Sequence, residues 1–492
     1  MCGDAADSGY GPSDARKRSS LYNAAPMTAA SPLFRETRAM LALAAPLFIA
    51  QLAQMGTGVV DTIMAGRYAS IDLAAIAIGY NLWLPLYLVA LGIRRAVTTI
   101  VAQHYGANRI ANIQAMLPQA FWVAVALGLI SAPVCYFPGP VLEQLSLDAV
   151  TYAKTEGYLK AVAFGLPGAA LFQAFRCHIQ GVGIVRPFAI ASVIGFFANV
   201  PLNYIFIYGK LGVPEMGAEG CGWATALSMW LGPALIAFYT LRSRALRDYL
   251  PAAQWYAPQG REIREILYIG GPIGATFFFE MAVFSVIGLL IATVSNREVA
   301  AHQIATSIYD IVYMPLMSIG SAMATRIGHG IGRGSIDDVR RSMKSGVLVA
   351  ASACLVMAVV FLRAPESIVS IYTTDKDIVA IAAGLLRLTL AFIVVDTAAV
   401  VTSYALRAFK DTRFPFLVMT VSYWLVALPL GYYLGLADIA SDLYGALGFW
   451  YAMVVGIAVA AVLTALRLRV WFGRPLAPDS HHNPDSLGSE PF

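Results

Sequence analysis

Four carboxylates stand alone within long apolar stretches of the sequence, and their type and setting make them the first candidates for chemistry. They are Asp61, Glu280, Asp310 and Asp396, and none has a basic residue one helical turn away. If these stretches cross a membrane, a carboxylate costs roughly 2.5–3.5 kcal/mol at the bilayer centre on insertion scales. Desolvation favours its protonated form, whereas its ionised form offers hard oxygen ligands to a cation. These groups are therefore suited to take up and release a proton or a sodium ion.

The alternative for each carboxylate is a structural role, as a side chain hydrogen-bonded to a neighbouring helix. Glu280 and Asp396 are centred in their apolar stretches, which favours a functional role. Asp61 lies near the end of its stretch, and Asp310 is flanked by tyrosines. For these two residues the sequence leaves both interpretations open.

Two asparagines add polar groups to another apolar stretch. Asn199 and Asn203 lie one helical turn apart, on either side of Pro201. Because a proline frees a backbone carbonyl, this face could bind a cation or orient a carboxylate. Amide hydrogen bonds between helices, beside a proline kink, are the structural alternative.

Arg94 and Arg95 follow an apolar stretch and precede the polar end of their predicted helix at His104. Successive residues point about 100° apart on a helix, so one arginine can face a cleft while the other faces protein. An arginine in a cleft would bind an anionic substrate or pair with a carboxylate. The alternative is that both side chains extend to an aqueous edge.

The composition places these residues in a membrane protein. Of 492 residues, 58% are hydrophobic and 13% are charged, against about 25% charged in a soluble globular chain, and the mean hydropathy is +0.66. A helix needs about 20 apolar residues to cross the hydrocarbon core. The pattern predicts an all-α polytopic fold of twelve transmembrane helices, roughly at 38–64, 73–103, 115–137, 156–180, 187–209, 221–241, 264–293, 299–326, 344–363, 378–406, 415–435 and 443–472.

The distribution of positive charge predicts the orientation. With the N-terminus taken as cytoplasmic, 24 of the 34 Lys and Arg residues lie in inside segments, 7 lie outside and 3 lie within spans. Cytoplasmic loops carry the excess of Lys and Arg. We therefore expect a multi-pass protein of the bacterial inner membrane with both termini in the cytoplasm.

The chain divides into five parts. Residues 1–36 and 475–492 are predicted to be disordered cytoplasmic tails, and 242–264 to be an Arg-rich cytoplasmic linker. Between them, 37–241 and 265–474 form an N-lobe and a C-lobe of six helices each. The first tail contains no short apolar stretch followed by a cleavage site, so we expect no signal peptide.

The two halves repeat. Pro187 and Pro201 match Pro415 and Pro429 at an offset of 228 residues, and matches nearer the start of each half keep an offset of 226. Each half has an even number of helices, so the repeats are parallel and related by a pseudo-two-fold axis along the membrane normal. Such a pair surrounds a cleft that can open to either side, as in a transporter. Duplication retained only for packing is the weaker alternative.

The remaining residue types argue against several other functions. The sequence has no basic stripe with interleaved aromatic residues, so we expect no nucleic-acid partner. Its five cysteines and six histidines are scattered, without metal-ligand spacing or a disulfide framework, which speaks against a membrane enzyme. We expect no cofactor other than a coupling ion, and a chain that acts as a monomer in the lipid bilayer.

These motifs resemble the multidrug and toxic compound extrusion (MATE) family, in particular its NorM-like bacterial branch. The resemblance covers nearly the whole chain outside the tails, and one motif that carries it is Asn199-Val200-Pro201-Leu202-Asn203. The other similar segments are 45–55, 60–66, 101–107, 208–209, 300–303 and 328–329.

The resemblance implies a transporter that expels organic cations and hydrophobic drugs in exchange for Na⁺ or H⁺. It implies alternating access between two six-helix lobes. It also implies that Asp61, with Asn199 and Asn203 beside it, couples the cation in the N-lobe. Glu280 and Asp396 would do so in the C-lobe, where they are a candidate Na⁺ site.

Two features depart from the family pattern. Arg94 and Arg95 stand where apolar residues are usual, and Asp310 stands where a small polar residue is usual. From the resemblance as a whole we expect an antiporter of small drug-like molecules, cationic or amphipathic. The alternative is a flippase or exporter of an anionic lipid-linked or phosphate-bearing substrate that uses Arg94 and Arg95.

Overall fold

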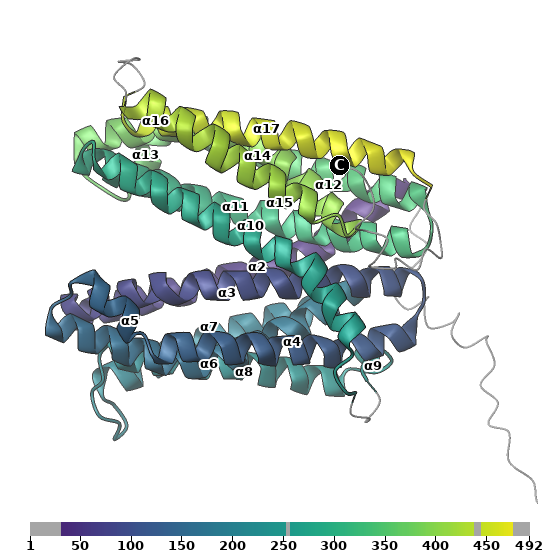
Figure 1. The fold of residues 1–492 in the computed structure, drawn as a ribbon, viewed down its shortest axis with the longest axis horizontal. Coiled ribbons are helices and arrows are strands. Elements are labelled where there is room, and N and C mark those ends of the chain that lie inside the picture. The colour runs from purple at the N-terminus through teal and green to yellow at the C-terminus, as the bar shows by residue number, and fades with distance from the viewer. Residues whose placement is uncertain (1–30, 252–255, 437–443, 476–492) are drawn as a thin grey trace, which may run out of the picture.

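A computed structural model describes residues 31–251, 256–436 and 444–475, and all regular secondary structure within these ranges is helical. Twelve long helical elements form two lobes, as predicted (Figure 1). The N-lobe contains α2 (Pro32–Tyr68), α3 (Ser70–Gly106), α4 (Ile110–Tyr136), α6 (Ala149–Val182), α7 (Arg186–Tyr208) and α8 (Ala218–Arg242). The C-lobe contains α10 (Gly260–Ala292), α11 (Asn296–Gly332), α12 (Ile336–Arg363), α14 (Lys376–Ala408), α15 (Arg413–Thr420) with α16 (Leu428–Leu436), and α17 (Ala446–Gly473).

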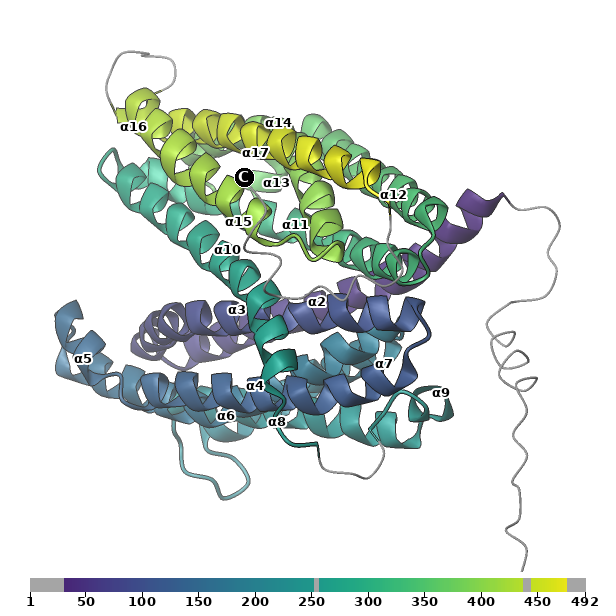
Figure 2. The ribbon, with the colours of Figure 1, turned by 45° about the vertical axis from the view of Figure 1, so that its right-hand side comes forward.

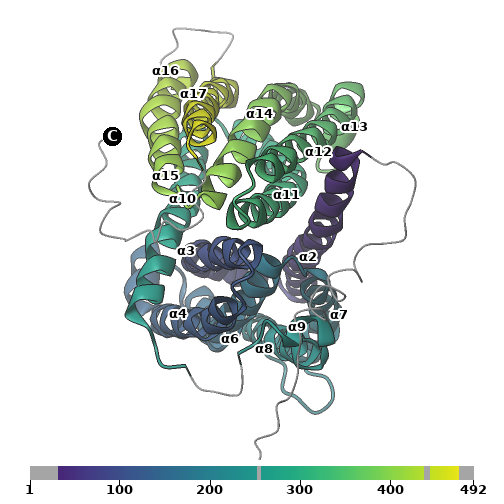
Figure 3. The ribbon, with the colours of Figure 1, turned by 90° about the vertical axis from the view of Figure 1, so that its right-hand side faces the viewer.

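Short elements complete the described chain. A π-helical segment, Val421–Ala427, joins α15 to α16, so that the three pieces form one membrane-spanning unit. The connections carry α5 (Gly139–Leu142), the 3₁₀ turn Glu143–Leu145, α9 (Arg244–Arg247) and α13 (Pro365–Val369). Seen end-on, the two bundles lie one above the other (Figure 3).

Eleven of these units are long and apolar enough to cross a membrane. The twelfth, α11, has 37 residues, like α2 and α3, but it is more polar. It packs against α2 and α3 of the other lobe and carries Asp310 on an exposed position. Its lower apolarity follows from its place between the lobes, where fewer of its side chains need to face lipid.

Side-chain caps explain where several helices begin. The Ser31 hydroxyl accepts a hydrogen bond from the Phe34 amide, the Asp148 carboxylate caps α6 and the Asp375 carboxylate caps α14. Such caps satisfy amide groups that have no partner within the helix. The capped helix α2 begins earlier than the apolar pattern predicted, and so does α10, although no side chain caps it. Residues 32–36 of the predicted tail and 260–264 of the predicted linker are therefore helical.

Most of the two predicted tails, 1–30 and 476–492, lies outside the described residues. The linker between the lobes is described except for 252–255, and it contains α9.

Equivalent contacts in the two lobes confirm the internal repeat. In the N-lobe, the Asp72 carboxylate accepts a hydrogen bond from the Ala218 amide at the start of α8, at 2.7 Å. In the C-lobe, the Glu298 carboxylate accepts one from the Ala446 amide at the start of α17, at 2.9 Å. The equivalent residues Asp72 and Glu298 are 226 apart in the sequence, and Ala218 and Ala446 are 228 apart. The same device therefore ties the second helix of each lobe to the last.

The lobes meet where α3 contacts α10 and α11 and where α2 contacts α11 and α12, and the crossing of α3 with α11 is nearly symmetric. The Gln103 side-chain amide donates to the Ala408 carbonyl at 2.8 Å, and the ring Nε2 of His329, 226 positions later, donates to the Gly181 carbonyl at 2.8 Å. A side chain on Gly332 would collide with the Gln103 carbonyl, and one on Gly106 with the His329 carbonyl. The pseudo-two-fold axis therefore passes through a backbone contact that has room only for glycine.

Hydrogen bonds between the lobes occupy one half of the molecule. They lie toward the ends at which α3, α6, α11 and α14 finish, and we call this the closed end. The pairs are Glu36–Arg326, Glu36–Ser342, Thr37–Ser345, Gln51–Ser318, Arg95–Tyr404, Gln103–Ala408, Gln180–Ser321 and Gly181–His329.

Toward the opposite end the lobes diverge (Figure 2). Tyr80 of α3 and Asp310 of α11 lie close enough to interact electrostatically, yet Tyr80 is 41% exposed and Asp310 is also exposed. The two lobes are therefore not packed against each other at this level, and we call the space between them the cleft.

We expect Gly332→Ala to lower the thermal unfolding temperature of the purified protein by several degrees. Elsewhere in a helix, Gly→Ala stabilises by about 0.5–1 kcal/mol, but here the added methyl group would force α3 and α11 apart. The matched control is Gly384→Ala in α14, where nothing lies within 4 Å of the added carbon. Equal unfolding temperatures for the two variants would show that the crossing is not tightly packed.

Candidate functional site

The N-lobe carboxylate lies where three helices converge. Asp61 of α2 is 7% exposed. Its Oδ1 accepts a hydrogen bond from the Asn203 amide of α7 at 2.5 Å, and its Oδ2 accepts one from the Thr225 hydroxyl of α8 at 3.1 Å. Asn203 also donates to the Asn199 Oδ1 at 2.8 Å. The structure thus brings together the three residues that the sequence placed near one another, and adds Thr225.

Two polar atoms of this N-lobe cluster make no hydrogen bond. Asn199 Nδ2 and Asn203 Oδ1 are buried without a hydrogen-bond partner among the described residues. Buried polar atoms are normally paired, so a cluster with spare donors and acceptors around a carboxylate is suited to a small ion or a water. Thr225 was missed because a lone threonine in an apolar helix gives no signal in the sequence.

The C-lobe holds a second carboxylate in a similar setting. Asp396 of α14 is 2% exposed, and its Oδ2 accepts a hydrogen bond from the Tyr309 hydroxyl of α11 at 3.0 Å. In the sequence, Tyr309 stands out only as a neighbour of Asp310. The two residues in fact diverge, because adjacent positions on a helix point in different directions: Tyr309 turns into the lobe and Asp310 is exposed in the cleft.

Glu280 of α10 lies near Asp396, and the two are close enough to interact electrostatically. Glu280 is half-buried and lies within the same range of Arg407 and Arg95. The π-helical segment contacts the residue before Glu280, since the Trp424 indole donates a hydrogen bond to the Phe279 carbonyl at 3.2 Å. The two predicted C-lobe carboxylates therefore form one cluster, separate from the Asp61 cluster in the other lobe.

Within the described residues, no three His, Cys, Asp or Glu side chains are arranged to hold a metal ion. A sodium ion at Glu280 and Asp396 would draw on these two carboxylates and on neutral oxygens such as the Tyr309 hydroxyl. Sodium is a hard cation that accepts such a mixed set of oxygen ligands.

Arg94 and Arg95 point in different directions, as one of the sequence-based interpretations requires. Arg94 is 1% exposed inside the N-lobe, where its Nε and Nη1 have no hydrogen-bond partner among the described residues. Arg95 points between the lobes, donates to the Tyr404 hydroxyl at 2.8 Å and stacks over the Phe277 ring at 4.9 Å. Of the two, only Arg95 reaches the space between the lobes.

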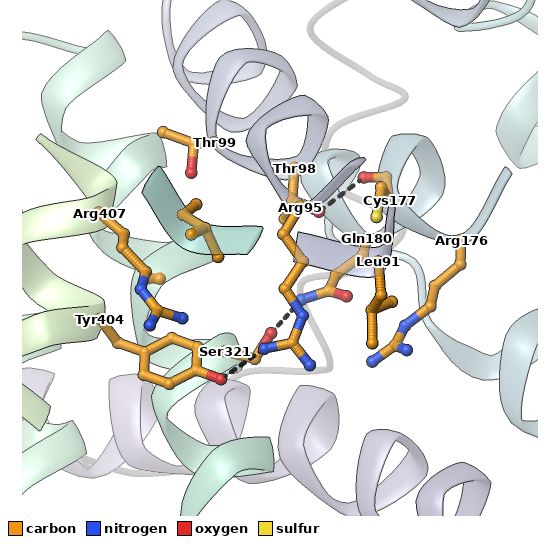
Figure 4. A pocket seen from close by; sticks show the side chains of 12 residues that line it. Leu91, Arg95, Thr98, Thr99, Arg176, Cys177, Gln180, Ser321, Tyr404 and Arg407 are labelled. Atoms are coloured by element: carbon orange, nitrogen blue, oxygen red, sulfur yellow. Dashed lines mark hydrogen bonds between the residues drawn. The ribbon is translucent and has the colours of Figure 1, made fainter. Parts of the chain in front are cut away.

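Arg95 shares a cavity with two further arginines (Figure 4). Arg176 comes from α6 and Arg407 from α14, so the cavity has walls from both lobes. Both are among the 24 Lys and Arg residues predicted to lie on the inside, and the structure adds that their side chains line this cavity. The other lining residues are Leu91, Thr98, Thr99, Cys177, Gln180, Ile273, Ser321, Ala324 and Tyr404.

Known proteins share both the sequence and the fold of this chain. The sequence model of the MatE family matches residues 46–205 and 272–433, and the starts of these segments are 226 residues apart, which is the offset of the repeat. The multidrug resistance protein MdtK of Edwardsiella ictaluri is 36% identical over 444 residues, 90% of this chain and 96% of its own length. The multidrug resistance protein NorM of Photobacterium profundum is 35% identical over 435 residues, 88% of this chain and 95% of its own length.

Solved structures agree with the fold at lower sequence identity. The Vibrio cholerae MATE transporter VcmN in its bent form has a TM-score of 0.80 at 16% identity, over 90% of this chain and 98% of its own. The eukaryotic MATE transporter AtDTX14 has a TM-score of 0.79 at 19% identity, over 89% and 97%. This chain therefore belongs to the MatE family, whose members are multi-pass membrane transporters and not enzymes.

Proposed function

We propose that this chain is a secondary active antiporter that exports small drug-like molecules in exchange for Na⁺ or H⁺. The observation that carries the proposal is the pair of buried carboxylate clusters, one in each lobe, whose hydrogen bonds come from neutral donors. A carboxylate at membrane depth without a bonded cation is a place where a proton or small ion can bind. The names of the relatives, which are multidrug resistance proteins, support a drug-like cargo.

We further propose that the closed end faces the cytoplasm. The Arg-rich connection between the lobes, with α9, lies at this end (Figure 2), and cytoplasmic loops carry the excess of positive charge. The cleft beside Asp310 then opens outward, both termini are cytoplasmic, and the protein acts as a monomer in the bacterial inner membrane.

The exchange follows from the two clusters and the cleft between them. In the outward-open state, Na⁺ or H⁺ neutralises Asp396 and Glu280, and this weakens the binding of the cargo, which leaves. The lobes then rock, the closed end opens, and the cation is released before new cargo binds. Such coupling requires that each ligand prefers one of the two states, because a ligand with equal affinity for both shifts nothing.

We expect Asp396→Asn to lower gradient-driven ethidium efflux by roughly tenfold or more, since a neutral amide cannot take up a cation and coupling energies of 1–3 kcal/mol are typical. Efflux is measured in everted vesicles under a Na⁺ gradient and, separately, under a pH gradient. The gradient that drives the wild type identifies the coupling ion.

The control for this experiment is Asp337→Asn, which removes the same charge from an exposed position in the first turn of α12 and should leave efflux unchanged. Full gradient-driven efflux by Asp396→Asn would contradict the carboxylate mechanism.

Alternating access requires that the contacts at the closed end break in every cycle. The Ser345 hydroxyl of α12 donates to the Thr37 hydroxyl of α2 at 3.0 Å, so cysteines at these two positions would place their sulfur atoms close together. We expect oxidation of Thr37→Cys/Ser345→Cys to stop efflux, and a reducing agent to restore it, because the disulfide holds this end closed.

Each single cysteine variant serves as a control and should be unaffected by oxidation when all variants also carry Cys2→Ser, since the four described native cysteines are buried. If the doubly substituted protein is fully cross-linked and still transports, then α2 and α12 do not separate during the cycle.

A further inference from the structure

Three arginines face one cavity between the lobes, and no acidic residue lines it. Arg95 and Arg176 come from the N-lobe, and Arg407 comes from the C-lobe. The remaining polar walls are hydroxyl and amide groups, including those of Gln180 and Ser321, which hydrogen-bond to each other across the lobes at 2.7 Å. The cavity is therefore positively charged on both sides of the lobe interface.

None of these arginines has an anionic partner within ion-pair distance among the described residues. Arg176 donates a hydrogen bond to the side-chain oxygen Oε1 of Gln173 at 3.2 Å and stacks over the Phe188 ring at 4.3 Å. Arg407 stacks over the Tyr404 ring at 4.6 Å, and its Nη1 is buried without a hydrogen-bond partner. Neutral and aromatic groups thus hold the guanidinium planes in place but do not balance their charge.

This arrangement is costly without a ligand. A guanidinium does not lose its proton in proteins, burying an ion costs several kcal/mol even after relaxation, and like charges repel more strongly away from water. The Glu280 carboxylate is within electrostatic range of Arg95 and Arg407 but makes no hydrogen bond to either among the described residues. An incoming anion would relieve both the desolvation and the repulsion.

The size of the cavity limits what part of a molecule it can hold. Its volume is about 30 Å³, and a water needs about 10–15 Å³ on this measure. The cavity therefore admits one small group and not a whole drug-sized molecule. The planar fork of a guanidinium matches a carboxylate or phosphate, to which it can donate two parallel hydrogen bonds.

We propose that Arg95, Arg176 and Arg407 form an oxyanion-binding subsite, which takes a carboxylate or phosphate group of the transported molecule. This inference rests on the proposed transport function and specifies its substrate class. A substrate whose ammonium group lies near Glu280 while its anionic group occupies the cavity would still compete with the coupling cation, as the exchange requires. Because the subsite has walls from both lobes, an anion in it stabilises the state in which the closed end is shut.

The test measures binding to the purified full-length protein without any gradient. Thermal unfolding in detergent is followed with increasing benzoate or inorganic phosphate at constant ionic strength, and with neutral benzamide as the control ligand. We expect both anions, but not benzamide, to raise the unfolding temperature. Arg95→Gln and, separately, Arg407→Gln should weaken the apparent affinity for the anions by roughly tenfold or more, the loss typical of a charge-assisted hydrogen-bonded pair.

The matched control is Arg413→Gln, because Arg413 is exposed and stacks over Tyr268 away from the cavity. It should bind the anions as the wild type does. Asp396→Asn should also bind them normally, so a loss of exchange and a loss of anion binding can be told apart. Two separate variants at the subsite guard against one of them misfolding, which its unfolding temperature without ligand would reveal.

A membrane lipid phosphate is the other source of the same chemistry. The binding series is therefore repeated in nanodiscs of phosphatidylcholine alone and in nanodiscs that contain phosphatidylglycerol. Binding of the small anions in both, with the same dependence on Arg95, supports a substrate subsite. Loss of their binding when phosphatidylglycerol is present would assign the cavity to a lipid headgroup and overturn the proposal, as would equal affinities in wild type, Arg95→Gln and Arg407→Gln.

Discussion

Charges buried without a bonded counter-ion are the constraint on which the rest of this structure depends. Asp61 and Asp396 are hydrogen-bonded by neutral amide and hydroxyl groups, whereas Arg95 is held by a tyrosine and a phenylalanine ring. An ion pair would neutralise such a charge permanently, because separating two buried partners costs several kcal/mol. Neutral partners orient the group and leave its charge available for a ligand that comes and goes.

The two lobes can make use of such ligands because the contact at their closed end is polar and nearly symmetric. At the closed end, Gly106 and Gly332 let two helices touch through their backbones, and the ion pair of Glu36 with Arg326 lies at the same end. These polar contacts can break and form again more readily than the apolar contact in which Ile266, Ile269 and Ile273 of α10 pack against the N-lobe core. Because the crossing is nearly symmetric, a rocking motion of the lobes disturbs equivalent contacts in both of them.

The buried negative and positive charges lie in different parts of the molecule. Carboxylates lie within each lobe and along the open cleft, whereas three arginines gather near the closed end, between the lobes. A molecule that moves between the lobes therefore meets negative groups in the cleft and positive groups at its closed end. This arrangement of charges distinguishes the interior of this chain from a uniformly acidic pathway. Arg95 is one of the two arginines that depart from the family pattern.

The helices, their number, the repeat and the isolated carboxylates follow from the sequence alone, because apolar length and periodicity depend only on local order along the chain. The boundaries of α2 and α10 did not, since both helices begin in polar sequence that the apolar pattern does not cover. Only the tertiary structure decided which side chains meet. It brought Thr225 to Asp61 and Tyr309 to Asp396, and it placed Arg176 and Arg407 in the wall of one cavity. These contacts join helices far apart in the sequence, and their geometry depends on how the lobes pack, which no local pattern encodes.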